Sequence, residues 1–200
     1  MAKHPINADP KGTLMQLKVT LAGSRPSIWR RLLVPSDIKL SKLHTVLQIS
    51  MGWEDDHLHS FRHEDVTYEP AAHRKMGGGL FVSDENQDEA KVGLVDLLPS
   101  EGDWLVYEYD FGDGWEHEVS VEKIVPVGTA GARRAICLDG ARACPPEDCG
   151  GLAGYYRLLK IIVSPKHPEH RNTLEWLGER FDPEAFDAAR VDAALLRLKV

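Results

Sequence analysis

The chain has 200 residues, of which 42% are hydrophobic and 28% charged, and its formal net charge is −7. This composition excludes a disordered chain and is typical of a folded globular protein, at a length that suits one domain. No stretch approaches the ~18 consecutive apolar residues of a membrane-spanning helix, and the start MAKHPINADPKG lacks the apolar core of a secretory signal, so we expect a cytoplasmic protein without a membrane partner.

Charge is unevenly distributed along the chain. Residues 1–31 hold six basic groups against one acid, whereas residues 101–125 hold eight acids and a single base. Binding of duplex DNA rests on neutralising phosphates, so the acidic balance argues against it. A basic edge formed by Arg30, Arg31 and Lys18 nevertheless leaves a nucleic-acid accessory role as one hypothesis.

The first elements are predicted from apolar periodicity. Alternation over residues 14–21 and the run IWRRLLV at 28–34 predict two antiparallel strands. An apolar stripe at helical spacing then predicts a helix of about three turns, which Ser41 would cap and Gly52 would end. The N-terminal part is therefore expected to combine a sheet with one helix.

A row of histidines follows this helix. His57, His59 and His63 occupy alternate positions, and in a strand such positions face one side about 6.6 Å apart. Imidazoles at that spacing can converge on zinc or another transition metal, and they can equally satisfy hydrogen-bond partners beneath a sheet. Residues 70–88 lack regular periodicity and are expected to form a functional or mobile surface loop.

The stretch WLVYEYDFGDGWEHEVSVEKIV at 104–125 predicts a β-hairpin, because a Gly-Asp-Gly turn separates two β-type runs. Side-chain alternation puts His117 on its buried face. The two candidate turns differ by one residue and place either Asp110 or Glu108 opposite His117. Both alternatives therefore predict a carboxylate beside this imidazole.

The last part of the chain is predicted to consist of loop and helix. Two prolines and two glycines in CPPEDCGG at 144–151 indicate a rigid turn, and helical periodicity follows it. Asp182 and Pro183 suit an N-cap and the first helical position, so we expect a final helical section from there to Leu198.

These elements predict a single α+β domain over residues 1–200, with an antiparallel sheet of hairpins, helices packed on it and a helical C-terminal section. Residues 12–125 would form most of the sheet and one helix. Residues 126–200 would form the Cys/Pro/Gly loop and the helical section.

Five stretches carry a resemblance to a known family: IWRRLLVP at 28–35, MGWEDDHLHSF at 51–61, YEYDFGDGWEHEVSVEK at 107–123, CLDGARACPPEDCGG at 137–151 and LEWLGERFDPEAFD at 174–187. In them the chain resembles the plasmid pRiA4b ORF-3-like family, whose members are also described as insertion-element passenger proteins of TnpR type. The resemblance implies an α+β domain with an antiparallel sheet and no established activity. A resolvase would need a nucleophilic serine among arginines and a basic DNA-binding module, and the sequence shows no such arrangement.

The candidate catalytic residues lie in the hairpin and are Asp110, Asp113 and His117. A buried carboxylate orients an imidazole and raises its basicity, as general-base catalysis requires. The same residues could instead stabilise the turn and satisfy the core. Four further side chains are candidate binding residues: Tyr109, Trp115, Arg30 and Arg31.

Cysteines provide a second candidate metal site. Cys137, Cys144 and Cys149 are spaced C-x6-C-x4-C, and His117 would complete four ligands for zinc. An odd number of cysteines without a secretory context argues against disulfides and favours free thiols or a metal site. His57 and His59 are the other candidate metal ligands, so zinc is the expected cofactor if there is one.

Three functional hypotheses follow. The first is an accessory protein of plasmids or mobile elements that binds a protein or a small ligand through its sheet face and the 70–88 loop. The second is a metal-dependent hydrolase whose site joins His57, His59, Asp110 and His117. The third is the nucleic-acid accessory at the basic edge.

Overall fold

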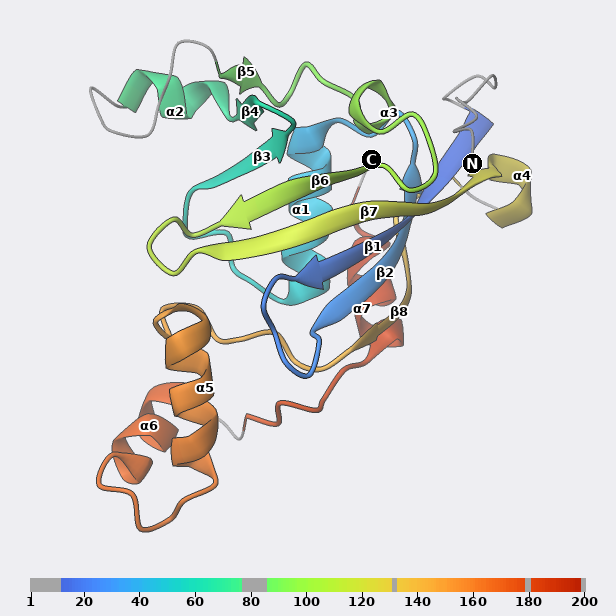
Figure 1. Ribbon diagram of the computed structural model, residues 1–200. Helices are drawn as coiled ribbons and strands as arrows, with labels where there is room; N and C mark the ends of the chain where they lie inside the picture. Colours follow the sequence, from blue (N-terminus) through green and yellow to red (C-terminus); the bar gives the residue numbers. More distant parts are fainter. Residues whose placement is uncertain (1–11, 77–85, 131–132, 179–180, 199–200) are drawn as a thin grey trace.

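The computed structural model describes residues 12–76, 86–130, 133–178 and 181–198. Over these residues the chain forms an eight-stranded sheet in the order β5-β4-β3-β6-β7-β1-β2-β8, antiparallel except between β4 and β5 (Figure 1). The elements in chain order are β1 (Thr13–Leu21), β2 (Trp29–Pro35), α1 (Leu40–Met51), β3 (His59–His63), β4 (Val66–Glu69), α2 (Ala71–Met76), β5 (Gln87–Asp88), α3 (Leu94–Leu97), β6 (Trp104–Tyr109), β7 (Trp115–Pro126), α4 (Val127–Ala130), β8 (Ile136–Ala141), α5 (Gly151–Ile162), α6 (His170–Leu177) and α7 (Ala188–Leu195). The predicted α+β class is confirmed.

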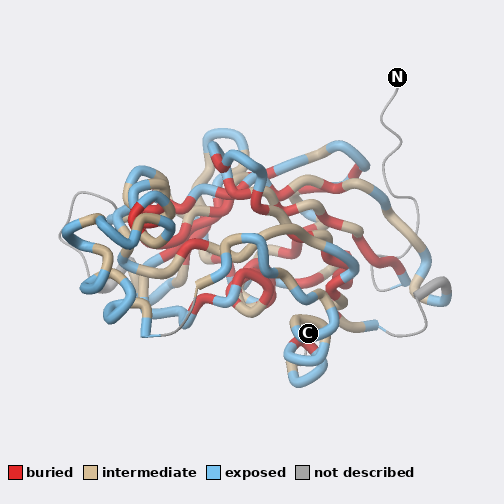
Figure 2. The backbone as a smooth tube through the Cα atoms, turned by 90° about the horizontal axis from the view of Figure 1, so that it is seen from below, coloured by how far each residue is buried: buried red, intermediate tan, exposed pale blue. Residues whose placement is uncertain are grey.

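Helices α1 and α7 cover one face of the sheet, and the other face is open (Figure 1). Buried residues gather between the sheet and these helices, as Figure 2 shows. The alternating residues Leu17 and Val19 of β1 and Val119 of β7 are fully buried there. On the open face Trp104 is 54% exposed. Within the described residues, none of the helices has the length and apolar character needed to span a bilayer.

Helix α1 ends where the sequence predicts but begins differently. Gly52 stops it in a left-handed conformation, with φ 93°. At the other end Lys39 occupies the N-cap position without a side-chain hydrogen bond, so the predicted cap at Ser41 is wrong. The amide of Leu40 instead donates to the carbonyl of Val92 at 3.1 Å, and this tertiary contact removes the need for a capping side chain.

The predicted hairpin of β6 and β7 is present, but both predicted registers are wrong. Tyr107 pairs with His117, because residues 110–114 form a loop that is longer than a two-residue turn. Asp110 adopts a left-handed φ of 55°, and its carboxylate accepts the amide of Gly112 at 2.9 Å. This internally bonded loop shifts the pairing, so a tyrosine rather than a carboxylate lies opposite His117.

The histidine row and the following loop also differ from expectation. Strand β3 begins at His59, so His57 lies in the preceding loop instead of on the strand face. The predicted irregular segment 70–88 starts with α2 and ends with β5, which pairs in parallel with β4. Residues 77–85 of that segment lie outside the described residues.

The last helix, α7, begins later than predicted. The Asp182 carboxylate accepts a hydrogen bond from the amide of Glu184 at 3.0 Å and stabilises a turn instead of a helix. The predicted helix start at Asp182 and Pro183 is therefore wrong. Helix α7 starts at Ala188 after Asp187, whose side chain accepts the amide of Arg190 at 3.0 Å. Helix α7 therefore begins directly after the residue whose side chain caps it.

The CPPEDCGG turn packs tightly against the hairpin loop. The amide of Gly150 donates to the Asp113 carboxylate at 3.1 Å, and a Cβ on Gly151 would lie 2.5 Å from the Asp113 carbonyl oxygen. Gly151 also has φ 65°. This close approach holds α5 at the end of the sheet.

Replacing Gly151 with alanine is expected to lower the free energy of unfolding by about 2–3 kcal/mol, since strain and a steric clash add. Urea denaturation measures the loss. The matched control is Gly178→Ala, because Gly178 has φ 69° and a Cβ added to it would meet no described atom within 4 Å. Equal losses in the two variants would show that the contact with Asp113 is unimportant.

Candidate metal-binding site

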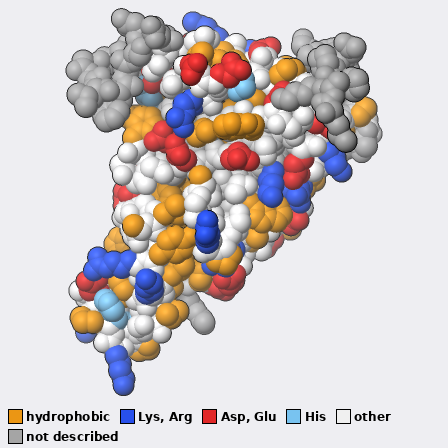
Figure 3. All heavy atoms as spheres, viewed as in Figure 1, with side chains coloured by type: hydrophobic (Ala, Val, Ile, Leu, Met, Phe, Trp, Pro, Cys, Tyr) orange, Lys and Arg blue, Asp and Glu red, His pale blue; other side chains and the backbone are white. Residues whose placement is uncertain are grey.

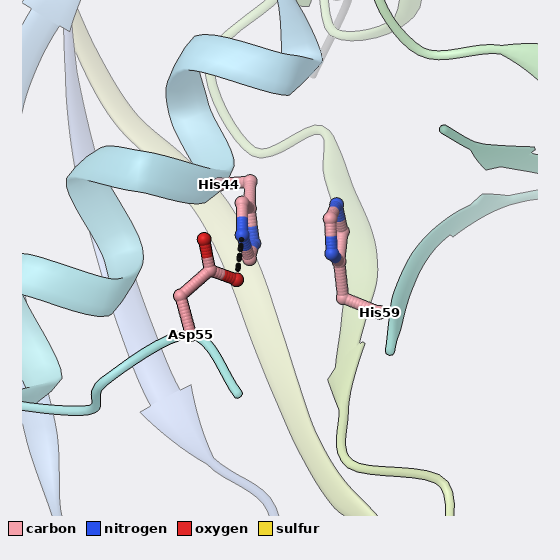
Figure 4. Close-up of side chains that lie close together, drawn as sticks. All are labelled: His44, Asp55 and His59. Carbon is pink, nitrogen blue, oxygen red and sulfur yellow. Dashed lines mark hydrogen bonds and ion pairs between the residues drawn. The ribbon is translucent and has the colours of Figure 1, made fainter. Parts of the chain in front are cut away.

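Two histidines and an aspartate from three different segments meet beneath the sheet. Figure 4 shows His44 from α1 and His59 from β3 facing each other, with the Asp55 carboxylate at the edge of the pair. The two imidazole rings are stacked, with centroids 3.4 Å apart and planes 4° from parallel. One ligand atom from each of the three residues lies within 4.8 Å of the other two. Imidazole and carboxylate are ligands that zinc accepts.

The local chain explains how Asp55 reaches His44. Gly52 ends α1 and reverses the chain, and Asp55 adopts a left-handed φ of 65°. Its amide donates to Gln48 Oε1 at 3.1 Å, which folds the loop back on the helix. As a result Asp55 Oδ1 lies 2.8 Å from His44 Nε2.

A hydrogen-bond network holds the other side of His44. His44 Nδ1 lies 2.8 Å from the hydroxyl of Tyr107, and that hydroxyl accepts from Gln48 Nε2 at 2.9 Å. The phenol proton is then available to Nδ1, which assigns the imidazole proton to Nε2, facing Asp55. Burial, reinforced by the nearby His59, lowers the pKa of His44 and favours its neutral form.

His59 is held in the same way by Glu89. Its Nε2 lies 3.0 Å from Glu89 Oε2, and both side chains are buried. Among the described residues, its Nδ1 has no hydrogen-bond partner. The ring of His73 meets His59 edge-on at a centroid distance of 5.9 Å. His44 therefore has a polar neighbour at both ring nitrogens, whereas His59 has one only at Nε2 within the described residues.

Asp55 is the member of the cluster that is exposed to solvent. The side chains of His44 and His59 are each 7% exposed, whereas that of Asp55 is 56% exposed. A ligand can therefore reach the cluster past Asp55.

A sequence model of the plasmid pRiA4b ORF-3-like protein family matches residues 13–190. The chain belongs to this family. An uncharacterised relative, y4hQ of Sinorhizobium fredii (strain NBRC 101917 / NGR234), is 38% identical over 186 residues, covering 92% of this chain and 91% of that protein. The crystal structure of MM3350 from Methanosarcina mazei Go1, a protein of unknown function, matches with a TM-score of 0.77 and 34% identity, covering 89% of this chain and 97% of that chain. Both similarities support the family and the fold, and neither name states an activity.

In this pRiA4b ORF-3-like protein, the four residues predicted to form one hydrolase site do not meet. His59 lies against His44, whereas His57 Nε2 lies 3.8 Å from Asp110 Oδ2 and 3.4 Å from Asp148 Oδ1. His117 is fully buried and has no carboxylate partner among the described residues. The four residues therefore do not form one site, because the loop before β3 carries His57 away from the strand face. The predicted pair of His57 and Asp110 is present, and with Asp148 it forms a second group of possible metal ligands.

The predicted catalytic residues of the hairpin have structural partners. Asp110 and Asp113 use their carboxylates to bond backbone amides of the two turns. His117 Nδ1 lies 3.4 Å from the Tyr107 carbonyl oxygen, and its Nε2 is buried without a partner among the described residues. Burial lowers the pKa of His117 to about 4. A neutral, inaccessible imidazole cannot exchange protons with a substrate.

The three cysteines stay apart from any cluster of metal ligands. They are free thiols, and within the described residues no cysteine belongs to a group of three ligand atoms within 4.8 Å of one another. Burial raises the pKa of Cys137 to about 11 and that of Cys149 to about 12, and it raises the pKa of Cys144 as well. In the absence of a metal these thiols are therefore neutral at pH 7.

The predicted binding residues are mostly interior. Tyr109 and Trp115 are fully buried, and the Tyr109 hydroxyl donates to Glu147 at 2.6 Å. Arg30 is 2% exposed. Arg31 bonds the Glu122 carboxylate through Nε at 2.6 Å and Nη2 at 2.9 Å. The basic edge expected from the sequence is therefore largely buried or neutralised.

Sequence reasoning missed three contributors to the cluster: His44, Glu89 and Tyr107. A signal for His44 was present, because it lies four residues after Leu40 and three before Leu47, on the same buried face of α1. Glu89 had no such signal, since it follows a two-residue strand at the end of the irregular segment. Its proximity to His59 depends on the parallel pairing of β5 with β4.

Proposed function

We propose that this protein binds a divalent transition-metal ion, with zinc the best match, through His44, Asp55 and His59. The observation that carries the proposal is the convergence of two imidazoles and one carboxylate within 4.8 Å. The sequence suggested zinc only through the cysteines and the histidine row, and this cluster takes one ligand from that row.

The neighbours of the ligands support a metal site. Metal-bound histidines usually bond a carboxylate or another polar group through their second nitrogen, which orients the ring. Here Glu89 bonds His59 and Tyr107 bonds His44. An ion bound at Nε2 of His44 would require the ring proton on Nδ1, which would then donate to the Tyr107 hydroxyl oxygen, and the Asp55 carboxylate beside Nε2 would be free to bind the same ion.

Metal binding would require a change in the stacked pair. The lone pair of an imidazole nitrogen lies in the ring plane, and the planes of His44 and His59 are only 4° from parallel. One ion can therefore be shared only after a ring turns out of the stack. His59 is the ring expected to turn, since its described hydrogen bonding is limited to Glu89 through one nitrogen.

Hydrolysis is the reaction class that this ligand set supports. Three protein ligands leave the fourth position of a tetrahedral zinc ion for water, and zinc lowers the pKa of that water toward neutrality. The exposed side of Asp55 gives a substrate a route to this position. The reaction would therefore take place at the mouth of the loop between α1 and β3.

Zinc titration of the chelator-treated protein, followed by calorimetry and metal analysis, tests the proposal. We expect one equivalent per chain and binding at least about tenfold weaker in Asp55→Asn, which removes a charged ligand from a half-exposed position. Asp65→Asn is the matched control, because Asp65 is an exposed acid that belongs to none of the groups of possible metal ligands among the described residues. His59→Ala should also lose the site, whereas His63→Ala on the same strand should keep it.

Cobalt provides a spectroscopic check on the ligands. Cobalt in a tetrahedral site gives intense visible absorption, which should be present in the wild type and absent in His44→Ala. Failure of the wild type to bind zinc or cobalt, or equal binding by Asp55→Asn and Asp65→Asn, would contradict the proposed site.

The accessory role in plasmids or mobile elements stays a prediction, and so does the link to TnpR proteins. Its supporting features are the open sheet face and the exposed Trp104. Figure 3 shows acidic and basic side chains interspersed on this face, which suits a protein or small ligand better than a nucleic-acid backbone.

A further inference from the structure

Within the described residues, Arg30 is a buried cation that contacts neutral groups through its hydrogen bonds and its ring contact. Its Nε donates to the Ser50 carbonyl at 2.8 Å, and its Nη1 donates to the carbonyls of Trp29 at 2.9 Å and Ala141 at 3.1 Å. Its guanidinium lies over the ring of Phe186, 4.2 Å from the centroid. These contacts orient the charge but do not neutralise it.

No carboxylate pairs with Arg30 within residues 12–76, 86–130, 133–178 and 181–198, and over the same residues its Nη2 makes no hydrogen bond. Two thiols, Cys137 and Cys144, lie near enough to interact with its charge. Burial raises the pKa of both thiols, so neither carries negative charge at neutral pH. An unpaired buried charge is costly, and a bound anion would offset that cost.

Arg30 lines a pocket of about 780 Å³ between the end of α1, the Cys144–Pro146 turn and helix α7. This volume lies within the range of small-molecule sites. Much of the wall is apolar and comes from four segments: Ile49, Met51, Pro145, Leu177, Phe181, Phe186 and Val191. Glu54, Asp182 and Arg190 also line it and are exposed, which places charge of both signs at the rim.

We propose that this pocket binds a small carboxylate with an apolar body, its carboxylate paired with Arg30. Arg30 has one amino group, Nη2, that makes no hydrogen bond within the described residues, and a single donor group of this kind matches one carboxylate better than a phosphate, which needs more donors. The two rim acids oppose additional negative charge on the ligand. The apolar wall provides the burial that a short alkyl chain or an aromatic ring requires.

This site is separate from the proposed metal site. None of His44, Asp55 and His59 lines the pocket. Carboxylate binding therefore requires no zinc, and either proposal can fail while the other stands.

Hexanoate and benzoate, compared with hexanamide and benzamide, test the pocket by calorimetry on the full chain without added metal. We expect the acids to bind at least about tenfold more tightly than the amides, since a charge-assisted pair is lost in the amide. Inorganic phosphate is expected to bind more weakly than the acids.

Two variants on one helix locate the binding. Ala194→Phe should fill the pocket and abolish acid binding, because Ala194 lines it from an exposed position on α7. Ala193→Phe is the control, since Ala193 is exposed on the same helix and does not line the pocket. Both should retain zinc binding. The proposal is overturned if wild type binds no acid, if amides or phosphate bind as tightly, or if both variants behave alike.

Discussion

Replacing His117 with leucine is expected to make the protein more resistant to acid. His117 is fully buried, its Nε2 has no partner among the described residues, and burial lowers its pKa to about 4. Leucine has a similar volume and no polar atom to satisfy. At pH 7 the variant should therefore be as stable as the wild type or more stable by about 1 kcal/mol.

The sign of the pH dependence of folding stability follows from the direction in which the pKa of His117 is shifted. In the unfolded chain His117 titrates near its ordinary pKa of about 6.5, whereas in the folded protein it titrates at about 4. Between these values the unfolded state binds a proton that the folded state does not bind. Stability is therefore lost as pH falls through this window, by about 2 kcal/mol at pH 5 and about 3 kcal/mol near pH 4.

Urea denaturation of wild type and His117→Leu between pH 7 and pH 4 measures this contribution. The difference in unfolding free energy between the two proteins should widen by these amounts as pH falls. His63→Leu is the control, because His63 is only partly buried and lies at the end of β3. A constant difference between wild type and His117→Leu across the window would show that His117 is not buried in its neutral form.

The sequence predicted the sheet and its faces because that information is local. Alternation in β1 and β7 is a property of neighbouring residues, and the residues it assigned to the core, such as Val19 and Val119, are fully buried. The end of α1 at Gly52 was equally predictable, since a left-handed terminal residue favours glycine.

The hairpin register was not predictable from the same alternation. The strength of the Asp-Gly signal favoured a two-residue turn, whereas the Asp110 carboxylate stabilises a longer loop by bonding Gly112. That change moved the partner of His117 from a carboxylate to Tyr107. Because the loop is longer than a two-residue turn, His117 lacks the predicted carboxylate partner and is a buried neutral imidazole.

The candidate metal site depended on contacts between distant parts of the chain. His44 and Glu89 reach His59 from a helix and from the far edge of the sheet, and no spacing in the sequence encodes either distance. Only His59 belonged to a recognisable local pattern, the alternating histidines. Its partners could be named only once the order of the strands was known.

Replacing Arg30 with methionine is expected to cost about 3 kcal/mol of folding stability. Methionine fills similar space against Phe186, but it leaves the carbonyls of Ser50 and Ala141 without the donor that the structure shows. Hydrogen bonds from a charged donor contribute about 1.5–3 kcal/mol each, and the gain from removing a buried charge offsets only part of that loss.

Arg31→Met is the matched control, because Arg31 is the next residue and faces the opposite side of the sheet. Its bond to Glu122 lowers the pKa of that carboxyl to about 2, but the two side chains are 29% and 25% exposed, so solvent screens the pair. We therefore expect Arg31→Met to lower the free energy of unfolding by about 1 kcal/mol or less. Urea denaturation at neutral pH compares the two variants, and a loss at position 31 as large as that at position 30 would contradict a structural role specific to Arg30.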